Sequence, residues 1–342
     1  MKDSLVRLRG YAAHSRVKEG RDDMASMRQK IGVIGVGAVG SASLLSTVLR
    51  GVAREIVVVN RDPKRARGVV ADMQYGAALS AAVDLRAGDY SDLDGATLVM
   101  IAAGTNEKAG GATDRSDPTG RLRLLQSNAR VYQEILPRLA SAAPHAVILV
   151  LTDPPDPLAD LVRTFGFAHV LSSGTWLDSL RFRFHLARHL NVDAASVQAN
   201  VLGEHGTSQT FVWSSASISG VPVLETLKLS REGRETFRRQ VEHDVRFANI
   251  DIIEGNQASQ FGIGMVAARI AQAVLRDERV VVPIGSYNDD YGVTFSMPSV
   301  LGQTGVVQIL EPSMSTDERG ALRLSADRLR KALASLPQNT HA

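Results

Sequence analysis

Cysteine is absent from this 342-residue chain, which removes disulfides, thiolate nucleophiles and thiolate metal sites from its possible chemistry. The absence also fits a reducing compartment, and the N-terminus has no apolar core of signal-peptide type, so we expect a cytoplasmic location. Long apolar runs are missing too. The best candidate, AVILVL, is far shorter than the roughly 18 residues that suggest a membrane span.

An excess of charge of either sign is also lacking, because the net charge is only +3. Residues 1–30 hold eight basic and four acidic side chains, and this segment accounts for the excess. Aromatic residues make up 5% of the chain and no basic stripe runs among them, so nucleic-acid binding is not expected. We interpret residues 1–29 as a disordered tail or as the result of a start codon assigned too early.

The residues that are present indicate an α/β fold. Over residues 30–152, short β-rich runs such as IGVIGVG, EIVVVN and TLVMIAAG alternate with helical patterns. Continuous apolar strands with helical crossovers predict a Rossmann-type doubly wound parallel sheet that binds a dinucleotide. From residue 153 to residue 342 the rhythm changes to long helices mixed with β runs, which predicts an α+β substrate and catalytic domain.

A glycine motif supports the dinucleotide site. Gly35, Gly37 and Gly40 have the GxGxxG spacing between a predicted strand and a predicted helix, where a pyrophosphate can approach the backbone and the helix N-terminus. An NAD-specific site places an acidic residue about 20 residues further on. Here Asn60 and Arg61 stand there instead, so the cofactor is NAD or NADP, and Arg61 either pairs with a 2′-phosphate or only covers the adenine or faces solvent.

Residues 104–121, called the long loop below, connect the run TLVMIAA to a helical pattern that begins RLRLLQSN. Connections in compact strand–helix units usually have about 2–6 residues, so this loop is either functional or disordered. It is polar, rich in glycine, and carries Glu107 before it reaches Arg121.

Two segments of the second half carry candidate chemistry. In GTWLDSLRFR, Asp178 and Arg181 are three residues apart and therefore share a helix face. In VLGEHGTSQ, His205 lies in a glycine-flanked loop just after a predicted strand. An imidazole supported by a carboxylate is a general acid or base near neutral pH. The alternatives are a surface histidine and an ordinary helical ion pair.

With these residues the chain resembles the L-lactate and L-malate dehydrogenase family, including its L-2-hydroxyisocaproate branch. The resemblance runs from about residue 30 to residue 336. It rests on several motifs in the same order: the glycine turn, AGDYSD, RLRLLQSN, GTWLDSLRFR, GEHG, IIEGNQASQFGIGM and YGVTFSMPSVLGQTGV.

The resemblance implies a role for each matching residue. His205 would exchange a proton with the substrate oxygen, Asp178 would hold the histidine, and Arg121 would polarise the carbonyl as the long loop closes. Arg181 would grip the substrate carboxylate. Further substrate contacts would come from Asp153, Ser259 and Glu107, where Ser259 replaces the usual threonine and also suits a helix N-cap. The cofactor would contact Gly35, Gly37, Val39, Gly40, Asn60, Arg61, Ala103, Gly104, Asn106 and Asn128.

Three departures from the family pattern concern the substrate. Asp153 replaces an asparagine, Glu107 stands at a position that sets substrate choice, and 16 residues separate Gly104 from Arg121, which is more than in the family. This insertion leaves open whether Glu107 reaches the site. If Glu107 and Asp153 do face the substrate, they disfavour malate and favour a 2-oxo acid with a cationic or hydrogen-bond-donating end, or an iminium.

The sequence therefore predicts an NAD(P)-dependent L-2-hydroxyacid dehydrogenase of the lactate dehydrogenase type, with unusual substrate specificity. The alternatives are a malate dehydrogenase, a reductase of an imine analogue, and a non-catalytic nucleotide-binding relative. An NAD-dependent glycosidase is disfavoured, because that group uses a metal held by cysteine and histidine. We expect no metal, no membrane partner, and a homodimer or homotetramer.

Overall fold

The structure is a computed structural model that describes residues 29–336, so the predicted N-terminal tail lies outside it apart from residue 29. Its larger sheet has nine strands: β1 (Lys30–Ile34), β2 (Glu55–Val59), β3 (Asp84–Ala87), β4 (Leu98–Ile101), β5 (Val147–Val150), β6 (Val170–Ser172), β10 (Val280–Asn288), β11 (Val293–Gly302) and β12 (Gly305–Ile309). The strand order is β12-β11-β10-β6-β5-β4-β1-β2-β3. In this order, β6, β5, β4, β1, β2 and β3 are parallel to one another. This arrangement confirms the predicted doubly wound parallel sheet.

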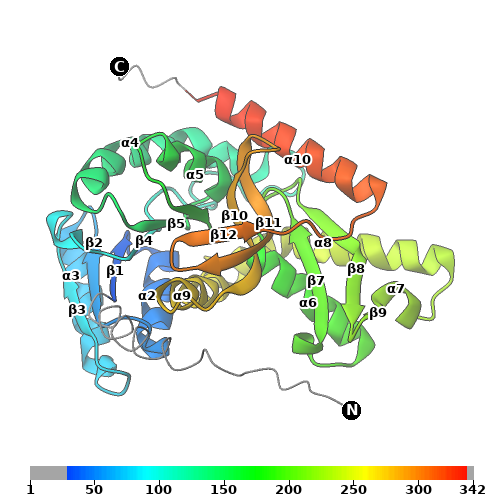
Figure 1. The fold of residues 1–342 in the computed structure, drawn as a ribbon, viewed down its shortest axis with the longest axis horizontal. Helices are drawn as coiled ribbons and strands as arrows, with labels where there is room; N and C mark the ends of the chain where they lie inside the picture. The colour runs from blue at the N-terminus through cyan, green and yellow to red at the C-terminus, as the bar shows by residue number, and fades with distance from the viewer. Residues whose placement is uncertain (1–28, 337–342) are drawn as a thin grey trace, which may run out of the picture.

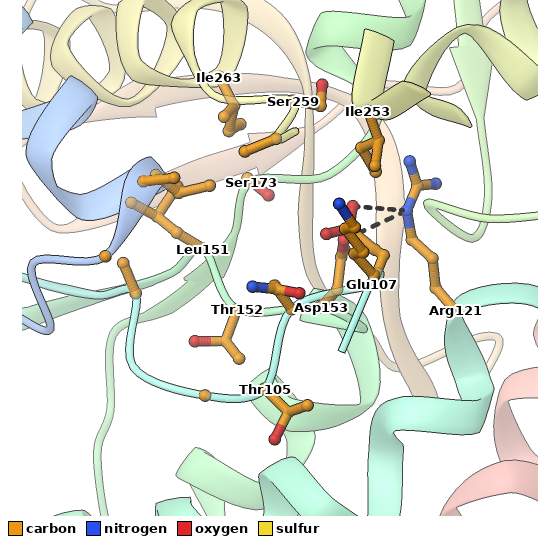
Figure 2. A pocket seen from close by; sticks show the side chains of 18 of the residues that line it. Thr105, Glu107, Arg121, Leu151, Thr152, Asp153, Ser173, Ile253, Ser259 and Ile263 are labelled. Atoms are coloured by element: carbon orange, nitrogen blue, oxygen red, sulfur yellow. Dashed lines mark ion pairs between the residues drawn. The ribbon is translucent and has the colours of Figure 1, made fainter. Parts of the chain in front are cut away.

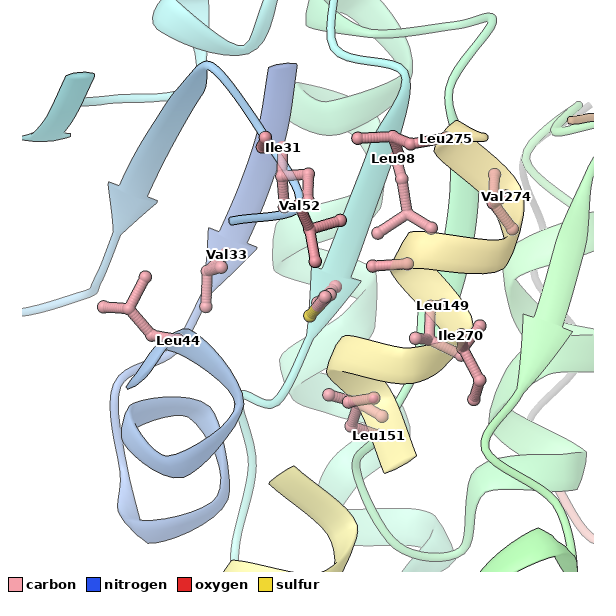
Figure 3. Close-up of a cluster of buried hydrophobic side chains, with 14 of the residues drawn as sticks. Ile31, Val33, Leu44, Val52, Leu98, Leu149, Leu151, Ile270, Val274 and Leu275 are labelled. Carbon is pink, nitrogen blue, oxygen red and sulfur yellow. The ribbon is translucent and has the colours of Figure 1, made fainter. Parts of the chain in front are cut away.

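Helices cover both faces of the parallel strands (Figure 1). They are α2 (Ala38–Arg50), α3 (Pro63–Ala77) and α9 (Phe261–Leu275) on one face, and α4 (Leu125–Ala142) and α5 (Pro155–Arg163) on the other. Successive strand residues point to opposite faces. In β4, accordingly, Leu98 and Met100 belong to the apolar cluster on the face covered by α2, α3 and α9, which we call the first cluster. Val99 and Ile101 belong to the cluster on the face covered by α4 and α5. Figure 3 shows part of the first cluster, in which α9 lies across β4 and β5.

A smaller sheet stands beside the first (Figure 1). It consists of β7 (Val197–Leu202), β8 (Thr210–Ile218) and β9 (Val221–Pro222), with α6 (Trp176–Leu190), α7 (Val223–Thr226) and α8 (Arg231–Asn256) packed against it. Its core includes Phe182, whose ring makes edge contacts with Phe211 and Trp213. The last helix, α10 (Thr316–Ala334), begins at a capping box formed by Ser315 and Glu318 and packs on β8, β11 and α5.

The two halves of the sequence share the larger sheet. β10, β11 and β12 come from the second half, and β10 pairs antiparallel with β6 through Gly285 and Ser172. The predicted division at residue 152 stays a prediction, and the sheet is continuous across it. Three short 3-10 helices complete the described chain: η1 (Ser91–Leu93), η2 (Gly120–Leu124) and η3 (Ala194–Ser196). Within residues 29–336, no single helix has the length and apolarity of a membrane span; α8 and α9 pass that test only as a pair bent by 118°.

Candidate active site

The glycine turn between β1 and α2 fits a dinucleotide. Gly35 has a φ of +91°, and a Cβ on Gly40 would lie 1.9 Å from the carbonyl oxygen of Gly35, so both positions require glycine. Gly37 has open space where its Cβ would stand, and it caps α2 without a side-chain hydrogen bond. The helix N-terminus is therefore bare on the side where a pyrophosphate would bind.

After the end of β2, a neutral amide and not a carboxylate bonds to this turn. The Oδ1 atom of Asn60 accepts a hydrogen bond from the backbone N–H of Val36 at 3.2 Å. The Nε atom of Arg65 donates to the carbonyl oxygen of Val36 at 3.0 Å, and Arg61 is exposed nearby in the sequence. The side chains that contact the turn from this end are therefore an arginine, Arg65, and a neutral amide, Asn60.

A cavity of about 150 Å³ opens beside the turn. The predicted site residues that line it are Gly37, Val39, Gly104, Asn106, Glu107, Arg121, Asp153, Arg181, His205 and Ser259. The predicted residues that do not line it are Gly35, Gly40, Asn60, Arg61, Ala103, Asn128 and Asp178. Most of the second group lies at the glycine turn and ribose end or directly behind the cavity wall.

Several lining residues were not predicted, among them Thr152, Ser173, Leu177, Ile253 and Gln257. Ser173 directly follows β6, and a polar residue at the carboxyl end of a parallel strand is a signal that could have identified it. Leu177 and Ile253 are apolar and carry no chemical signal, so only the packing of α6 and α8 around the cavity reveals them.

His205, Asp178 and Arg181 form a connected group at one wall. The Nδ1 atom of His205 lies 2.6 Å from Oδ2 of Asp178, and Nη1 of Arg181 donates to Oδ1 of the same carboxylate at 2.9 Å. Burial by itself would raise the pKa of Asp178, but His205 and Arg181 outweigh it and hold that pKa below its usual value. Burial lowers the pKa of His205, against the opposing effect of Asp178. No described residue hydrogen-bonds to Nε2 of His205, so this nitrogen is free to meet a ligand.

Asp156, which was not predicted, holds the backbone of this histidine. Its Oδ2 accepts the N–H of His205 at 2.7 Å, and its Oδ1 accepts the hydroxyl of Ser172 at 2.5 Å. The side chain is fully buried, and burial raises its pKa to about 7 although both hydrogen bonds lower it. The position of His205 therefore depends on a carboxyl group carried by α5 and on β6 behind it.

Glu107 and Asp153 converge on Arg121 at the other wall (Figure 2). The Nε atom of Arg121 lies 3.2 Å from Oδ2 of Asp153 and 4.0 Å from Oε1 of Glu107. This Nε lacks hydrogen-bond geometry to either carboxylate, so the contacts are charge pairs only. The insertion in the long loop does not displace Glu107, which lines the cavity with its side chain 17% exposed.

Asn128 joins the long loop to Asp153 from behind the cavity. Its Oδ1 accepts the N–H of Thr105 at 2.7 Å, while its Nδ2 donates to the carbonyl oxygens of Thr105 and Asp153 at 3.1 Å and 2.6 Å. The side chain is fully buried. It therefore fixes the start of the loop against the residue that faces His205.

The long loop is folded over the cavity and contacts the second half of the chain. Arg115 pairs with Glu254 through two hydrogen bonds of 2.8 Å and 3.1 Å, and also with Asp251, all on α8. Lys108 contacts Gln257 just after that helix. At the far end the hydroxyl of Thr207 donates to the carbonyl oxygen of Pro118 at 3.1 Å. No three His, Asp or Glu side chains in residues 29–336 are arranged to hold a metal ion.

Comparison with known proteins covers almost all of the described chain. Residues 29–169 match the family model of the lactate/malate dehydrogenase NAD binding domain, and residues 175–339 match that of the lactate/malate dehydrogenase alpha/beta C-terminal domain. The L-lactate dehydrogenases of Deinococcus radiodurans and Thermus aquaticus are each 40% identical. The first match covers 88% of this chain and 97% of the relative, and the second covers 90% and 99%.

Solved structures agree with the sequence relatives. A lactate dehydrogenase from a Medee basin deep-sea metagenome library superposes with a TM-score of 0.81 at 30% identity, over 90% of this chain and 98% of that one. The minor L-lactate dehydrogenase of Enterococcus mundtii gives 0.82 at 28% identity, over 91% and 99%.

Proposed function

The chain belongs to the lactate/malate dehydrogenase family and is an oxidoreductase of the lactate dehydrogenase type, and from this premise we propose that it interconverts a 2-oxo acid and its L-2-hydroxy acid with NADH or NADPH. One observation carries the proposal: His205 is bonded through Nδ1 to Asp178 and lines the cavity with Nε2 free of protein hydrogen bonds. A histidine held in this way can pass a proton to a bound ligand.

Each residue of the site has a part in the reaction. The reduced nicotinamide, when bound, supplies the hydride that the 2-oxo carbon receives. His205 releases its Nε2 proton to the oxo oxygen and ends neutral, and in the reverse direction the neutral ring takes the hydroxyl proton. Asp178 keeps the second ring proton on Nδ1 and stabilises the charged imidazole. Arg181 pairs with the substrate carboxylate, and the free Nη groups of Arg121 polarise the carbonyl.

The charges around the cavity support a substrate class. At the wall where Glu107 and Asp153 share the guanidinium of Arg121, two acidic groups face one cation, which leaves a local excess of one negative charge when both are ionised. The second carboxylate of oxaloacetate would add to this excess, while a cationic end would offset it. We therefore propose a 2-oxo acid that ends in an amino or guanidino group, with an iminium analogue as the other candidate.

The ribose end supports acceptance of both cofactors. The family model matched by residues 29–169 is an NAD binding domain. Asn60 is neutral, Arg65 donates to the turn at Val36, and the carboxylate of Asp62 is engaged as the N-cap of α3, where it accepts the N–H of Lys64. We propose that NADPH serves beside NADH.

A substrate panel tests these assignments together. Oxidation of NADH and of NADPH is followed with pyruvate, oxaloacetate, and 2-oxo acids ending in an amino or a guanidino group. An amino 2-oxo acid can close to a cyclic imine, so the guanidino compound tests the cation alone. We expect kcat/KM at least tenfold higher for a cationic substrate than for oxaloacetate.

Two variants show whether the turnover belongs to this site. The substitution His205→Ala should lower kcat by about 10²–10⁴-fold, the range of general acid–base catalysis. His243→Ala, on the exposed part of α8, is the matched control and should leave kcat unchanged. Oxaloacetate turned over faster than every cationic substrate would refute the substrate class, and no turnover of any 2-oxo acid would refute the proposed function.

An apolar surface supports self-association. Leu45 and Leu49 on α2 are 46% and 66% exposed, and Phe261 and Met265 on the adjoining α9 are each 59% exposed. Large apolar side chains gathered on neighbouring helices are typical of protein interfaces. We propose that a second copy of the chain covers them.

A further inference from the structure

Two partly buried carboxyl groups share one guanidinium in the cavity. Oδ2 of Asp153 and Oε1 of Glu107 lie 3.2 Å and 4.0 Å from the same atom, Nε of Arg121, and each acidic side chain is 17% exposed. One arginine charge balances one carboxylate. Among the described residues the other cations lining the cavity form no ion pair with Glu107 or Asp153, since Arg181 pairs with Asp178 and Lys108 donates to the neutral amide of Gln257. The second carboxylate therefore has no partner of opposite charge.

The position of Asp153 shows what an ionised form would do there. Its Oδ1 lies 3.9 Å from Nε2 of His205. A substrate oxygen that takes the Nε2 proton must come within about 2.6–3.2 Å of that nitrogen, and on the side that faces Asp153 it would lie next to Oδ1. An ionised Oδ1 would repel the lone pairs of this oxygen. A protonated carboxyl group would instead offer it an O–H donor.

We propose that Glu107 and Asp153 hold one proton between them, and that Asp153 in its acid form donates a hydrogen bond to the 2-oxo oxygen of the substrate. Glu107 then keeps the negative charge that a cationic substrate end would meet. The proton pair is a property of the resting protein, whereas the hydrogen bond to the substrate rests on the proposed function. Asp153 is thereby a catalytic residue beside His205, and Glu107 sets its protonation.

The surroundings of Asp153 support the acid form. Burial raises its pKa well above the usual value, Arg121 opposes this, and Glu107 and Asp178 raise the pKa further. The other titratable groups that act on it are His205, Arg181 and Tyr132. Asn128 donates to the backbone carbonyl of Asp153 at 2.6 Å, which fixes the backbone from which this side chain enters the cavity.

Infrared spectroscopy tests the proton pair without any substrate. A protonated carboxyl group has a carbonyl band that a carboxylate lacks, and at roughly pH 8 ordinary Asp and Glu side chains are ionised. We expect such a band in the wild type, its loss in Asp153→Asn and its weakening or shift in Glu107→Gln. Asp156→Asn is the matched control, because Asp156 is another buried carboxyl group near His205 whose pKa is raised, and there the band should remain. A wild type without the band, or Asp153→Asn with it, would overturn the proposal.

The pH dependence of L-lactate oxidation tests the role in catalysis. Neutral His205 must accept the hydroxyl proton, so kcat/KM rises as the pH passes the pKa of His205. The acid form of Asp153 is required, so kcat/KM falls again as the pH passes the raised pKa of Asp153. We expect this alkaline fall to vanish in Asp153→Asn and to move to lower pH in Glu107→Gln, because removal of a neighbouring negative charge lowers the pKa of Asp153.

The two measurements separate the possible failures. An alkaline fall that persists unchanged in Asp153→Asn would show that Asp153 is not the acid donor, even if the infrared band is present. If neither L-lactate nor a guanidino 2-hydroxy acid is oxidised at all, the proposed function fails, and the infrared band still decides whether the two carboxyl groups share a proton.

Discussion

Asp156 is a buried carboxyl group whose nearest charged neighbours have the same sign. Glu204 and Asp160 both raise its pKa in addition to burial, and its partners are the hydroxyl of Ser172 and the N–H of His205. A carboxyl group without a cation is costly to ionise in such a place. Asp156 serves the protein by accepting the N–H of His205 and so fixing its backbone. A neutral side chain of the same shape could accept this hydrogen bond too.

This arrangement predicts that Asp156→Asn stabilises the protein at alkaline pH. The folded-state pKa of Asp156 is about 7, and that of an unfolded Asp is about 3.9. The folded state therefore binds more protons between these values, and its stability falls as the pH rises from about 4 to about 7. Asparagine cannot ionise, so the free energy of unfolding of the variant relative to wild type should rise over this range by on the order of 4 kcal/mol.

Urea unfolding at a series of pH values measures this difference. The matched control is Asp72→Asn on the exposed part of α3, whose free energy of unfolding should follow the wild type at every pH. A difference between Asp156→Asn and wild type that does not change with pH would show that Asp156 is ionised throughout in the folded protein.

At the scale of elements, the long loop is tied to α8 by exposed charges. Arg115 contacts both Glu254 and Asp251, and these two acidic side chains are 60% and 65% exposed. Exposed ion pairs are worth little individually and are weakened by salt. The contact therefore stabilises the closed loop only modestly. A loop that must open to admit substrate cannot be held more strongly than this.

We predict that Arg115→Gln raises KM for the 2-oxo acid about two- to fivefold, which corresponds to the loss of one or two exposed ion pairs. The wild-type KM should rise with salt, and the KM of the variant should respond to salt less. Steady-state kinetics at low and high ionic strength measure both effects. Arg231→Gln removes an exposed pair within α8, Arg231 with Glu235 at 3.5 Å, and should change neither KM nor its salt dependence. Equal KM values for Arg115→Gln and wild type would contradict a role in loop closure.

At the scale of the whole molecule, α2 and α9 present their apolar sides outward next to one another. On its inner side, α9 buries Ile270 and Val274 in the first cluster. On its outer side, its residues Phe261 and Met265 are exposed. The glycine turn begins α2, and the loop after α8 leads to Ser259 and α9. A partner that covers these helices would therefore rest directly on the elements that carry the cofactor turn and one wall of the cavity.

The double substitution Leu49→Glu with Met265→Glu should shift the protein toward monomer, because burying unpaired carboxylates in an interface is costly. Analytical ultracentrifugation over a range of protein concentrations measures the change. Leu79→Glu, at a side chain 94% exposed just beyond α3, is the control and should keep the wild-type state. A sedimentation coefficient unaffected by the double substitution would place the interface elsewhere.

The sequence by itself determined the parallel half of the fold and the family, because both depend on local pattern. Apolar runs of strand length, helical periodicity and the spacing of Gly35, Gly37 and Gly40 are each read within a few residues. The placement of Asp178 and Arg181 on one helix face is of the same kind, and both residues lie on α6. The short strand β6 and helix α5 were not predicted, because a three-residue strand and a proline-rich helix start give weak local signals.

Only the tertiary structure decided which distant residues meet. β10, β11 and β12 extend the larger sheet because the edge of β6 is available for pairing. No pattern in the sequences of these three strands indicates that β10 pairs with β6. Asp156 reaches His205 across 49 positions of sequence, and Glu107 meets Arg121 and Asp153 because the long loop is tied to α8 and Asn128. Charge and distance in three dimensions set the chemistry of these carboxyl groups, and residue spacing along the chain carries no information about either.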